Sequence, residues 1–400
     1  MMSEWTTQRL EEIIQVNPTV KLTKGEVYPF IDIDKVSPTL RSVTNEEEKV
    51  YDGQSCSKFC NGDTVFSRIT PCLENRKIAK VSIDEQAAFG STEFYVFRAK
   101  EGKSDENYVY YLTSSDAVVL PAINSMTGAS GRQRADKRFI ERTKLNVPDL
   151  PTQKRIAEIL SAYDDLIENN NRRIALLEKA AQELYKEWFV RFRFPGYENA
   201  KFENGLPEGW NVKRLVDYGK VETGKTPSTE VIENYGCEIM FVKTPDMHGN
   251  LFTIQTGEYL SKQGHLTQPK KLLPPNSIMV SCIGTGGVVS INAEQAHTNQ
   301  QINSIILDNS MFLEWLFFTC KGLKETIELF GATGATMTNL SKGKFEKLKV
   351  IEPKEKLISL FHDKVQPVFD EIKALMYNNK NLAKQRDLLL PRLMSGKLEV

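Results

Sequence analysis

The string GKVETGKT at residues 219–226 matches the phosphate-loop pattern G-x-x-x-x-G-K-T in full. In a working loop, backbone N–H groups between a buried strand and a helix surround the phosphates of a nucleotide. The preceding NVKRLVDY (211–218) reads as a short helical or irregular segment, and Pro227 follows the motif directly. A P-loop-type nucleotide-hydrolysing enzyme acting on nucleic acid is therefore kept as the alternative function rather than the main one.

Other residue types that perform catalysis are scattered. GTGG at 284–287 follows an apolar strand and is expected to form a tight turn. The Asn-Pro-Pro-aromatic motif of adenine-N6 methyltransferases is absent, and its nearest match is NPTV at 17–20. Cys56, Cys60 and Cys72 lie near no His, and their spacing differs from that of common zinc sites. We therefore predict no catalytic residues and no metal site.

Two groups of cationic and amide side chains are better suited to binding nucleic acid. Cations neutralise phosphates, whereas base edges are read by Arg at guanine and by Asn or Gln at adenine. The candidates for DNA contact are Arg132, Gln133, Arg134, Lys137 and Arg138 in the first half, and Asn299, Gln300, Gln301, Lys342 and Lys344 in the second. The alternative is a solvated charged face, with the amides bonded to turn backbones.

The composition limits the class of protein. Lys and Arg together number 52, as do Asp and Glu, so the formal net charge is zero. This balance counts against a protein that coats DNA by charge alone, but it allows local basic patches. The N-terminal MMSEWTTQRLEE lacks the features of a signal peptide, and no apolar run approaches the length of a membrane span. We expect a cytoplasmic protein with reduced thiols.

The chain repeats itself at an offset of about half its length. Identical residues meet near the start of each half, namely Trp5 with Trp210 and Leu10 with Leu215. Further on, the register is expected to slip by one, so that TGAS (127–130) meets TGAT (333–336) and Phe139 meets Phe345. One module, a globular region followed by a helix, is therefore predicted to occur twice.

Each predicted helix carries one apolar stripe in alternating steps of four and three residues, which is typical of a coiled-coil seam. The seam residues are Ile156, Leu160, Tyr163, Ile167, Ile174, Leu177 and Leu184 in the first helix, and Phe361, Val365, Val368, Ile372, Leu375, Leu382 and Leu389 in the second. Asn170 and Asn379 interrupt the stripes at different levels. Since the apolar stripe of an isolated helix would be exposed to water, we expect the two helices to pack on each other in an antiparallel arrangement.

The globular parts indicate a mixed α/β (α+β) fold. Short β-rich stretches separated by Gly, Pro and Asn lie at 27–33, 63–69, 94–98, 239–242, 277–283 and 301–307. We predict a first globular domain at 1–148, helix 149–192, linker 193–208, a second globular domain at 209–352 and helix 353–400.

The sequence resembles the specificity subunits of type I restriction-modification systems over nearly its whole length. The resemblance rests on the order of five segments, 148–168, 176–196, 206–228, 297–305 and 333–350, together with the duplication. It implies two target recognition domains, mounted on two long helices, that each read one half of a split, asymmetric DNA site. The first half lacks the HTNQQ and MTNLS strings of the second half.

The resemblance also implies the partners. The helices would bind two methyltransferase subunits, restriction and translocase subunits would join the complex, and S-adenosylmethionine, ATP and Mg²⁺ would act on those partners. The chain itself would be a non-catalytic DNA-binding subunit of a bacterial or archaeal host-defence system.

Overall fold

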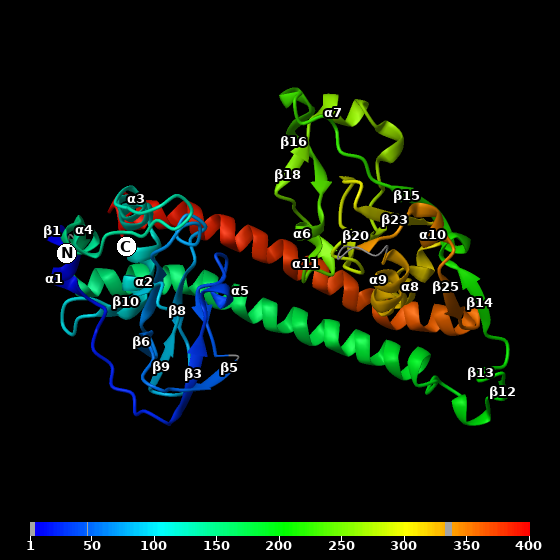
Figure 1. The fold of residues 1–400 in the computed structure, drawn as a ribbon, viewed down its shortest axis with the longest axis horizontal. Coiled ribbons are helices and arrows are strands. Elements are labelled where there is room, and N and C mark those ends of the chain that lie inside the picture. The colour runs from blue at the N-terminus through cyan, green and yellow to red at the C-terminus, as the bar shows by residue number, and fades with distance from the viewer. Residues whose placement is uncertain (1–4, 46, 333–337) are drawn as a thin grey trace. The chain divides into compact units, whose positions relative to one another are not determined.

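The computed structural model describes residues 5–45, 47–332 and 338–400 (Figure 1). The chain forms two compact units: unit 1 contains Met1–Asn169 and Asn379–Val400, and unit 2 contains Asn170–Asn378. These boundaries fall inside two long helices, α5 (Leu150–Tyr185) and α11 (Glu355–Met394), and not at the predicted ends of the globular domains. The reason is that each helix segment shares a core with a globular domain.

The central sheet of unit 1 has five strands. Their order is β2 (Ile14–Val16), β10 (Phe94–Ala99), β7 (Thr64–Ser67), β8 (Ile78–Val81) and β4 (Ser42–Val43). Alternate side chains of a strand face opposite sides, and here both sides are buried: Phe66 packs in the core with the helices, and Val65 packs in the core with the second sheet.

The second sheet of unit 1 and its helices complete the domain. The strand order is β5 (Glu47–Val50), β3 (Val27–Ile31), β9 (Ala87–Gly90) and β6 (Ser57–Cys60). The helices are α1 (Leu10–Ile13), α2 (Glu106–Ser114), α3 (Asp116–Asn124) and α4 (Lys137–Arg142). A separate ladder pairs β1 (Trp5–Arg9) with β11 (Lys144–Pro148). Asp105 begins α2 by accepting hydrogen bonds from the backbone of Asn107 and Tyr108, each at 3.0 Å.

Unit 2 repeats this design. Its five-stranded sheet runs β15 (Gly219–Thr223), β23 (Ile302–Leu307), β19 (Ile278–Ser281), β21 (Val289–Asn292) and β17 (Phe252–Thr253). In both sheets only the last pair is parallel, β4 with β8 and β17 with β21. The second sheet has the order β18 (Glu258–Leu260), β16 (Tyr235–Val242) and β22 (Ala296–Thr298). The predicted duplication and mixed fold are confirmed.

Smaller elements complete unit 2. The helices are α6 (Thr244–Met247), α7 (Lys262–Leu266), α8 (Leu313–Gly322), α9 (Lys324–Gly331) and α10 (Lys342–Glu346). The remaining ladders are β12 (Phe202–Glu203) with β13 (Leu206–Pro207), β14 (Asn211–Arg214) with β25 (Lys349–Glu352), and β20 (Ile283–Gly284) with β24 (Thr338–Asn339). The first of these ladders lies in the predicted linker.

The expected register slip is wrong at the second of its two places, the pairing of Phe139 with Phe345. Ile140 and Phe345 are both buried at the first turn of their helices, where their N–H groups bond Asp136 and Ser341. Phe139 is instead 51% exposed. The counterpart of Phe345 is therefore Ile140, since burial of the helix face sets the register. The TGAT string at 333–336 lies outside the described residues.

The two long helices run antiparallel within each unit, as predicted. In unit 2, Arg173 pairs with Glu371 at 2.5 Å, and the Trp188 ring lies 5.9 Å from the Phe361 ring. Residue numbers therefore rise along α5 as they fall along α11. In unit 1, Asp164 pairs with Arg386, and Leu160 shares a core with Leu393.

The buried stripe of α11 includes residues that contact the globular domain as well as residues that face the partner helix. Phe369 was not a predicted seam residue, yet it is 1% exposed and contacts Phe317 and Phe318 of the globular domain at ring distances of 5.7 and 5.8 Å. Its neighbour Val368 is only partly buried. The stripe faces the domain as well as the partner helix, so its centre departs from the predicted heptad.

The other predicted seam residues fall into a buried group and a partly exposed group. Ile156, Leu160, Ile167, Phe361, Val365, Ile372 and Leu375 are buried, whereas Tyr163, Ile174, Leu177, Leu184, Leu382 and Leu389 are partly exposed. Asn170 is buried and Asn379 is half-buried. Of the partly exposed positions, Ile174, Leu177 and Leu184 still pack against the core of unit 2, and Leu389 packs against that of unit 1.

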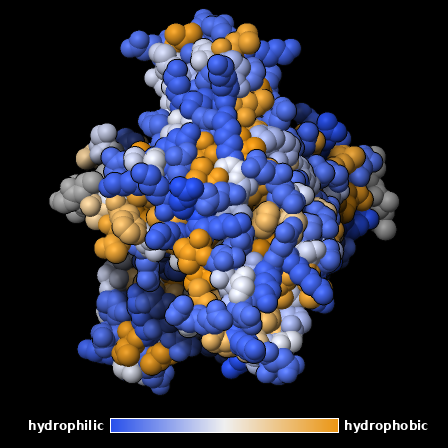
Figure 2. Space-filling model, turned by 90° about the vertical axis from the view of Figure 1, so that its right-hand side faces the viewer, coloured by the Kyte–Doolittle hydropathy of each residue, from blue (hydrophilic) through white to orange (hydrophobic). Residues whose placement is uncertain are grey.

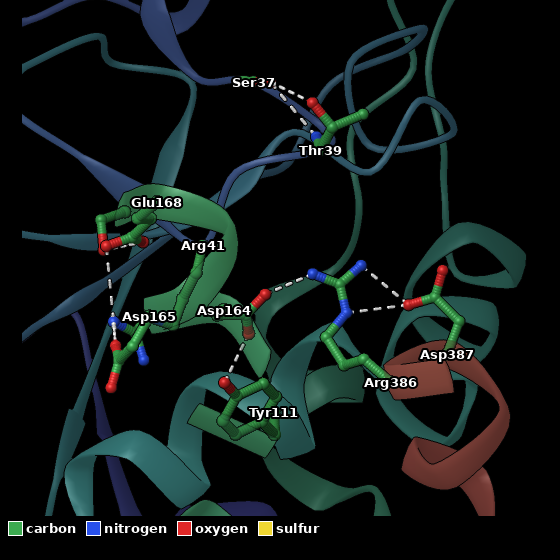
Figure 3. A network of polar contacts seen from close by, with 10 residues as sticks. Ser37, Thr39, Arg41, Tyr111, Asp164, Asp165, Glu168, Arg386 and Asp387 are labelled. Atoms are coloured by element: carbon green, nitrogen blue, oxygen red, sulfur yellow. Dashed lines mark hydrogen bonds and ion pairs between the residues drawn. The ribbon is translucent and has the colours of Figure 1, made fainter. Parts of the chain in front are cut away.

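A buried ion pair lies on the seam of unit 1 (Figure 3). Asp164 of α5 is 1% exposed and accepts from the guanidinium of Arg386 of α11. The hydroxyl of Tyr111 in α2 donates to the other carboxylate oxygen at 2.5 Å. Burial, with the negative charge of Asp164, raises the pKa of Tyr111, so the hydroxyl keeps its proton and remains a donor. One carboxylate thus joins α5, α11 and the globular domain.

Candidate nucleic-acid interface

An exposed hairpin carries the first candidate residues. Thr127 and Arg134 exchange backbone hydrogen bonds of 3.0 and 2.9 Å, which closes the loop between α3 and α4. Gly128 and Gly131 have φ values of +125° and +77°, a region that other residues rarely adopt. Arg132 is exposed at the tip of this loop.

Arg134 is held by a carboxylate that the sequence did not single out. Its Nε and Nη2 atoms donate to the two oxygens of Glu93 at 2.9 and 2.6 Å. Arg68 donates through Nε to the same carboxylate at 3.2 Å. The hydrogen bond from Arg134 lowers the pKa of Glu93 against the opposing effect of burial, and Arg68 adds to the lowering. The result is a carboxylate between two cations at the surface of unit 1.

The remaining first-half candidates surround this group. Gln133 is half-buried, and its N–H donates to the Thr70 hydroxyl at 3.1 Å. Lys137 pairs with Glu141 one helical turn away at 3.3 Å, and Arg138 is exposed on α4. Exposed cations of this kind suit phosphates, which carry no sequence information themselves.

The amide candidates of unit 2 occupy the turn between β22 and β23. Asn299 is 8% exposed, and its Nδ2 donates to Oε1 of Gln301 at 3.1 Å while its Oδ1 accepts from the Gln301 N–H at 3.2 Å. These hydrogen bonds stabilise the turn and agree with the alternative that the amides bond within turns, and DNA contact by Asn299 stays a prediction. Gln300 is exposed and Gln301 is half-buried.

The segment 219–226 packs against this turn and forms no phosphate loop. Residues Gly219–Thr223 are strand β15, and no helix follows directly. The N–H of Lys225 donates to the carbonyl of Thr298 at 2.9 Å. A Cβ on Gly224 would lie 2.2 Å from the Asn299 carbonyl oxygen, so glycine is needed for the close approach of the two backbones. Thr226 donates its hydroxyl to Oε1 of Gln300 at 2.6 Å, so the TGKT and HTNQQ strings meet.

The lysine candidates of unit 2 lie on α10. Lys342 is exposed and lies 3.7 Å from Glu346 on the next turn. Lys344 is exposed and donates to the Phe330 carbonyl at 3.4 Å. No hydrogen bond or ion pair joins these lysines to the amide turn among the described residues, so they stay separate candidates.

The Arg134 and Gln301 sites occupy the same place in the repeated fold. In unit 1, Arg68 donates its N–H to the Glu93 carbonyl at 2.9 Å, and in unit 2 Cys282 donates to the Gln301 carbonyl at 2.7 Å. The carbonyls of Arg68 and Cys282 then accept from Ala135 and Leu340 at 2.8 and 2.9 Å.

The register of these bonds defines the counterparts. Glu93 corresponds to Gln301, Arg68 to Cys282, and Arg134, which precedes Ala135, to Asn339. Sequence reasoning missed Glu93 and Arg68. The weak likeness of GDTVFSRIT (62–70) to PNSIMVSCIGT (275–285) was the signal that could have paired Arg68 with Cys282.

On the face drawn in Figure 2, apolar side chains form several patches separated by polar ones. In the described part of the chain, no group of three His, Cys, Asp or Glu side chains is placed to hold a metal ion. None of the helices in the described ranges is long and apolar enough to span a bilayer.

The chain is similar to known proteins over most of its length. A family model described as the type I restriction modification DNA specificity domain matches residues 2–179 and again 207–360. The HindI specificity subunit of Haemophilus influenzae is 31% identical, with 86% of this chain and 88% of that protein covered. The MjaIX specificity subunit of Methanocaldococcus jannaschii is 26% identical, with 99% and 94% covered.

A solved structure shares the fold. The type I restriction-modification S subunit from M. genitalium superimposes with a TM-score of 0.56 at 13% identity, covering 98% of this chain and 96% of that one. The two family matches coincide with the two copies of the duplicated domain and with parts of both long helices. On the family matches and the relatives together, this chain belongs to the type I restriction-modification DNA specificity family.

Proposed function

We propose that this specificity subunit reads a split, asymmetric DNA target, one half with each globular domain, and docks two methyltransferase subunits. The observation that carries the proposal is the duplicated domain with different side chains at one equivalent surface position. Glu93 with Arg134 in unit 1 corresponds to Gln301 with Asn339 in unit 2. One backbone design with two side-chain sets would recognise two unlike half-sites.

The exposed cations would supply the sequence-independent part of binding. Arg132 and Arg138 of unit 1 and Lys342 and Lys344 of unit 2 are exposed. Such side chains neutralise phosphates and make affinity fall steeply with salt concentration. Because the net charge of the chain is zero, we expect these local groups, not the overall field, to attract DNA.

Chemistry is assigned to the partners. We propose that S-adenosylmethionine, ATP and Mg²⁺ act on the methyltransferase and restriction subunits, in the cytoplasm of a bacterium or archaeon. The alternative P-loop function has no support, because residues 219–223 form a strand in a ladder with β23. Lys225→Ala is therefore expected to leave any ATP turnover of the complex unchanged.

The experiment is to map N6-methyladenine in a host that expresses this chain with its methyltransferase partner. We expect a two-part, non-palindromic motif. Arg132→Ala should alter one half of that motif only, and Gln300→Ala should alter only the other half. Methylation that does not depend on this chain, or failure to co-purify with the methyltransferase, would overturn the proposed function.

A further inference from the structure

The two arginines around Glu93 leave part of their hydrogen-bonding capacity unused. A guanidinium has five N–H donors, arranged so that two different edges can each bind a pair of acceptors. Arg134 presents the Nε/Nη2 edge to Glu93 and is 46% exposed at its side chain. Among the hydrogen bonds in the described residues, its Nη1 atom takes no part. The Nη1/Nη2 edge is therefore available to a second partner.

The carboxylate also has unused capacity. Each oxygen of an ionised carboxylate accepts about two hydrogen bonds. Oε2 of Glu93 accepts from Arg134 and Arg68, whereas among the described residues Oε1 accepts from Arg134 alone. A fixed donor edge thus lies beside a fixed acceptor. In a G·C pair the major groove presents the O6 and N7 acceptors of guanine beside the N4 amino donor of cytosine.

The equivalent position of unit 2 has different chemistry. Gln301 and Asn339 replace Glu93 and Arg134, and the buried Cys282 replaces Arg68. An amide carries both a donor and an acceptor and no charge, which suits adenine. The same place in the fold therefore carries charged side chains suited to a G·C pair in one copy and neutral amides in the other.

We propose that Arg134 and Glu93, held by Arg68, form the base-reading centre of the first recognition domain and take a G·C pair. Arg134 donates to guanine O6 and N7, and Glu93 accepts from cytosine N4. Arg68 is a positioning residue that keeps the carboxylate in place. The inference rests on the proposed function, and it names the residues that read the first half-site and the base pair that they contact.

The test uses the full chain assembled with its methyltransferase subunits. Once the methylation motif is known, each guanine of each half-site is replaced in turn by 7-deazaguanine, which lacks the N7 acceptor. Wild-type complex should lose affinity at one guanine of one half-site. Because O6 still accepts, the expected loss is at most about 5- to 140-fold, which corresponds to the roughly 1–3 kcal/mol of a complete bidentate contact.

Variants separate base reading from folding. Arg134→Ala should bind the natural duplex more weakly and no longer distinguish 7-deazaguanine at that position. Arg76→Ala is the matched control, because Arg76 is also an exposed arginine paired with a carboxylate, Asp116, in unit 1; it should behave as wild type. Arg68→Ala should weaken the discrimination without abolishing it.

Two results would overturn the inference and leave the proposed function intact. One is wild-type binding that is indifferent to every 7-deazaguanine, and the other is an Arg134→Ala variant in which the effect of the sensitive guanine persists. Complex that binds no target duplex at all would instead refute the proposed function. A methylation motif that relaxes at one G·C position in Arg134→Ala cells would support the inference independently.

Discussion

Replacement of Arg386 by leucine tests how the two long helices are held together in unit 1. The substitution removes the cation and leaves Asp164, which is 1% exposed, without its ionic partner. Tyr111 still donates one hydrogen bond at 2.5 Å, but a hydroxyl does not neutralise the charge. Breaking a buried pair by removal of one partner costs about 3–5 kcal/mol of unfolding free energy. Because the Arg386 side chain is 16% exposed, we expect the lower part of that range.

The assay is urea denaturation followed by far-UV circular dichroism, with the slope and the midpoint both fitted. The double variant Asp164→Leu/Arg386→Leu should recover most of the loss, since a hydrophobic pair removes the desolvation cost of both charges. The control is Arg173→Leu, which breaks an inter-helix pair in unit 2 whose side chains are 51% and 44% exposed. Such an exposed pair contributes at most about 1 kcal/mol.

The outcome that refutes this reasoning is a loss in Arg386→Leu no larger than that in Arg173→Leu. It would mean that water reaches the Asp164 carboxylate in the folded protein. A double variant less stable than Arg386→Leu would refute the second step, because the new leucines would then pack worse than the charges did.

Three further predictions concern stability and spacing. Phe361→Ala should destabilise the protein by about 3–5 kcal/mol, because the phenylalanine ring is fully buried. Leu382→Ala, at a half-exposed position, should lower the free energy of unfolding by under about 1 kcal/mol. Urea denaturation of both variants measures the difference. Burial, with a smaller contribution from His265, lowers the pKa of His297 from 6.5 to about 4, so below pH 6.5 the unfolded chain takes up a proton that the folded chain does not. The contribution of His297 to the free energy of unfolding is thus complete above pH 6.5 and should fall by up to roughly 3 kcal/mol as the pH drops to 4. Denaturation of His297→Asn at pH 7, 5.5 and 4.5 should show a shallower loss of stability than that of the wild type. Insertion of one heptad into both long helices at matched places adds about 10 Å, or some 3 base pairs, and should lengthen the unread gap of the methylation motif; an assembled variant that methylates the original spacing would contradict this.

Much of the architecture follows from local pattern. The four-and-three spacing of apolar residues predicted both long helices, and α5 and α11 begin close to the expected residues. The β-rich stretch at 94–98 is β10, and that at 301–307 is β23. Such patterns depend on neighbours a few residues apart, so a single sequence carries them.

The burial of individual seam residues was predicted less well. Phe369 is buried although Val368 was expected, because the aromatic side chains of α8 pack on α11 from the side of the globular domain. Asn299 was expected to face DNA, yet its amide is used within its own turn. The burial of Phe369 has no local signal, since it depends on the segment that packs opposite, whereas Asn299 bonds a residue only two positions further along the chain.

The sequence by itself determined that one module occurs twice, that each copy ends in a long amphipathic helix, and to which family the chain is similar. Only the tertiary structure decided that Glu93 lies between Arg68 and Arg134, and that this group corresponds to Gln301 and Asn339. The physical reason is strand pairing. Side chains 25 and 41 positions apart become neighbours because β7 and β10 pair in a sheet and the hairpin before α4 closes on them. Arg134 and Asn339 keep the offset of Trp5 and Trp210, but Glu93 and Gln301 do not, so the hydrogen-bond register is needed to pair these two.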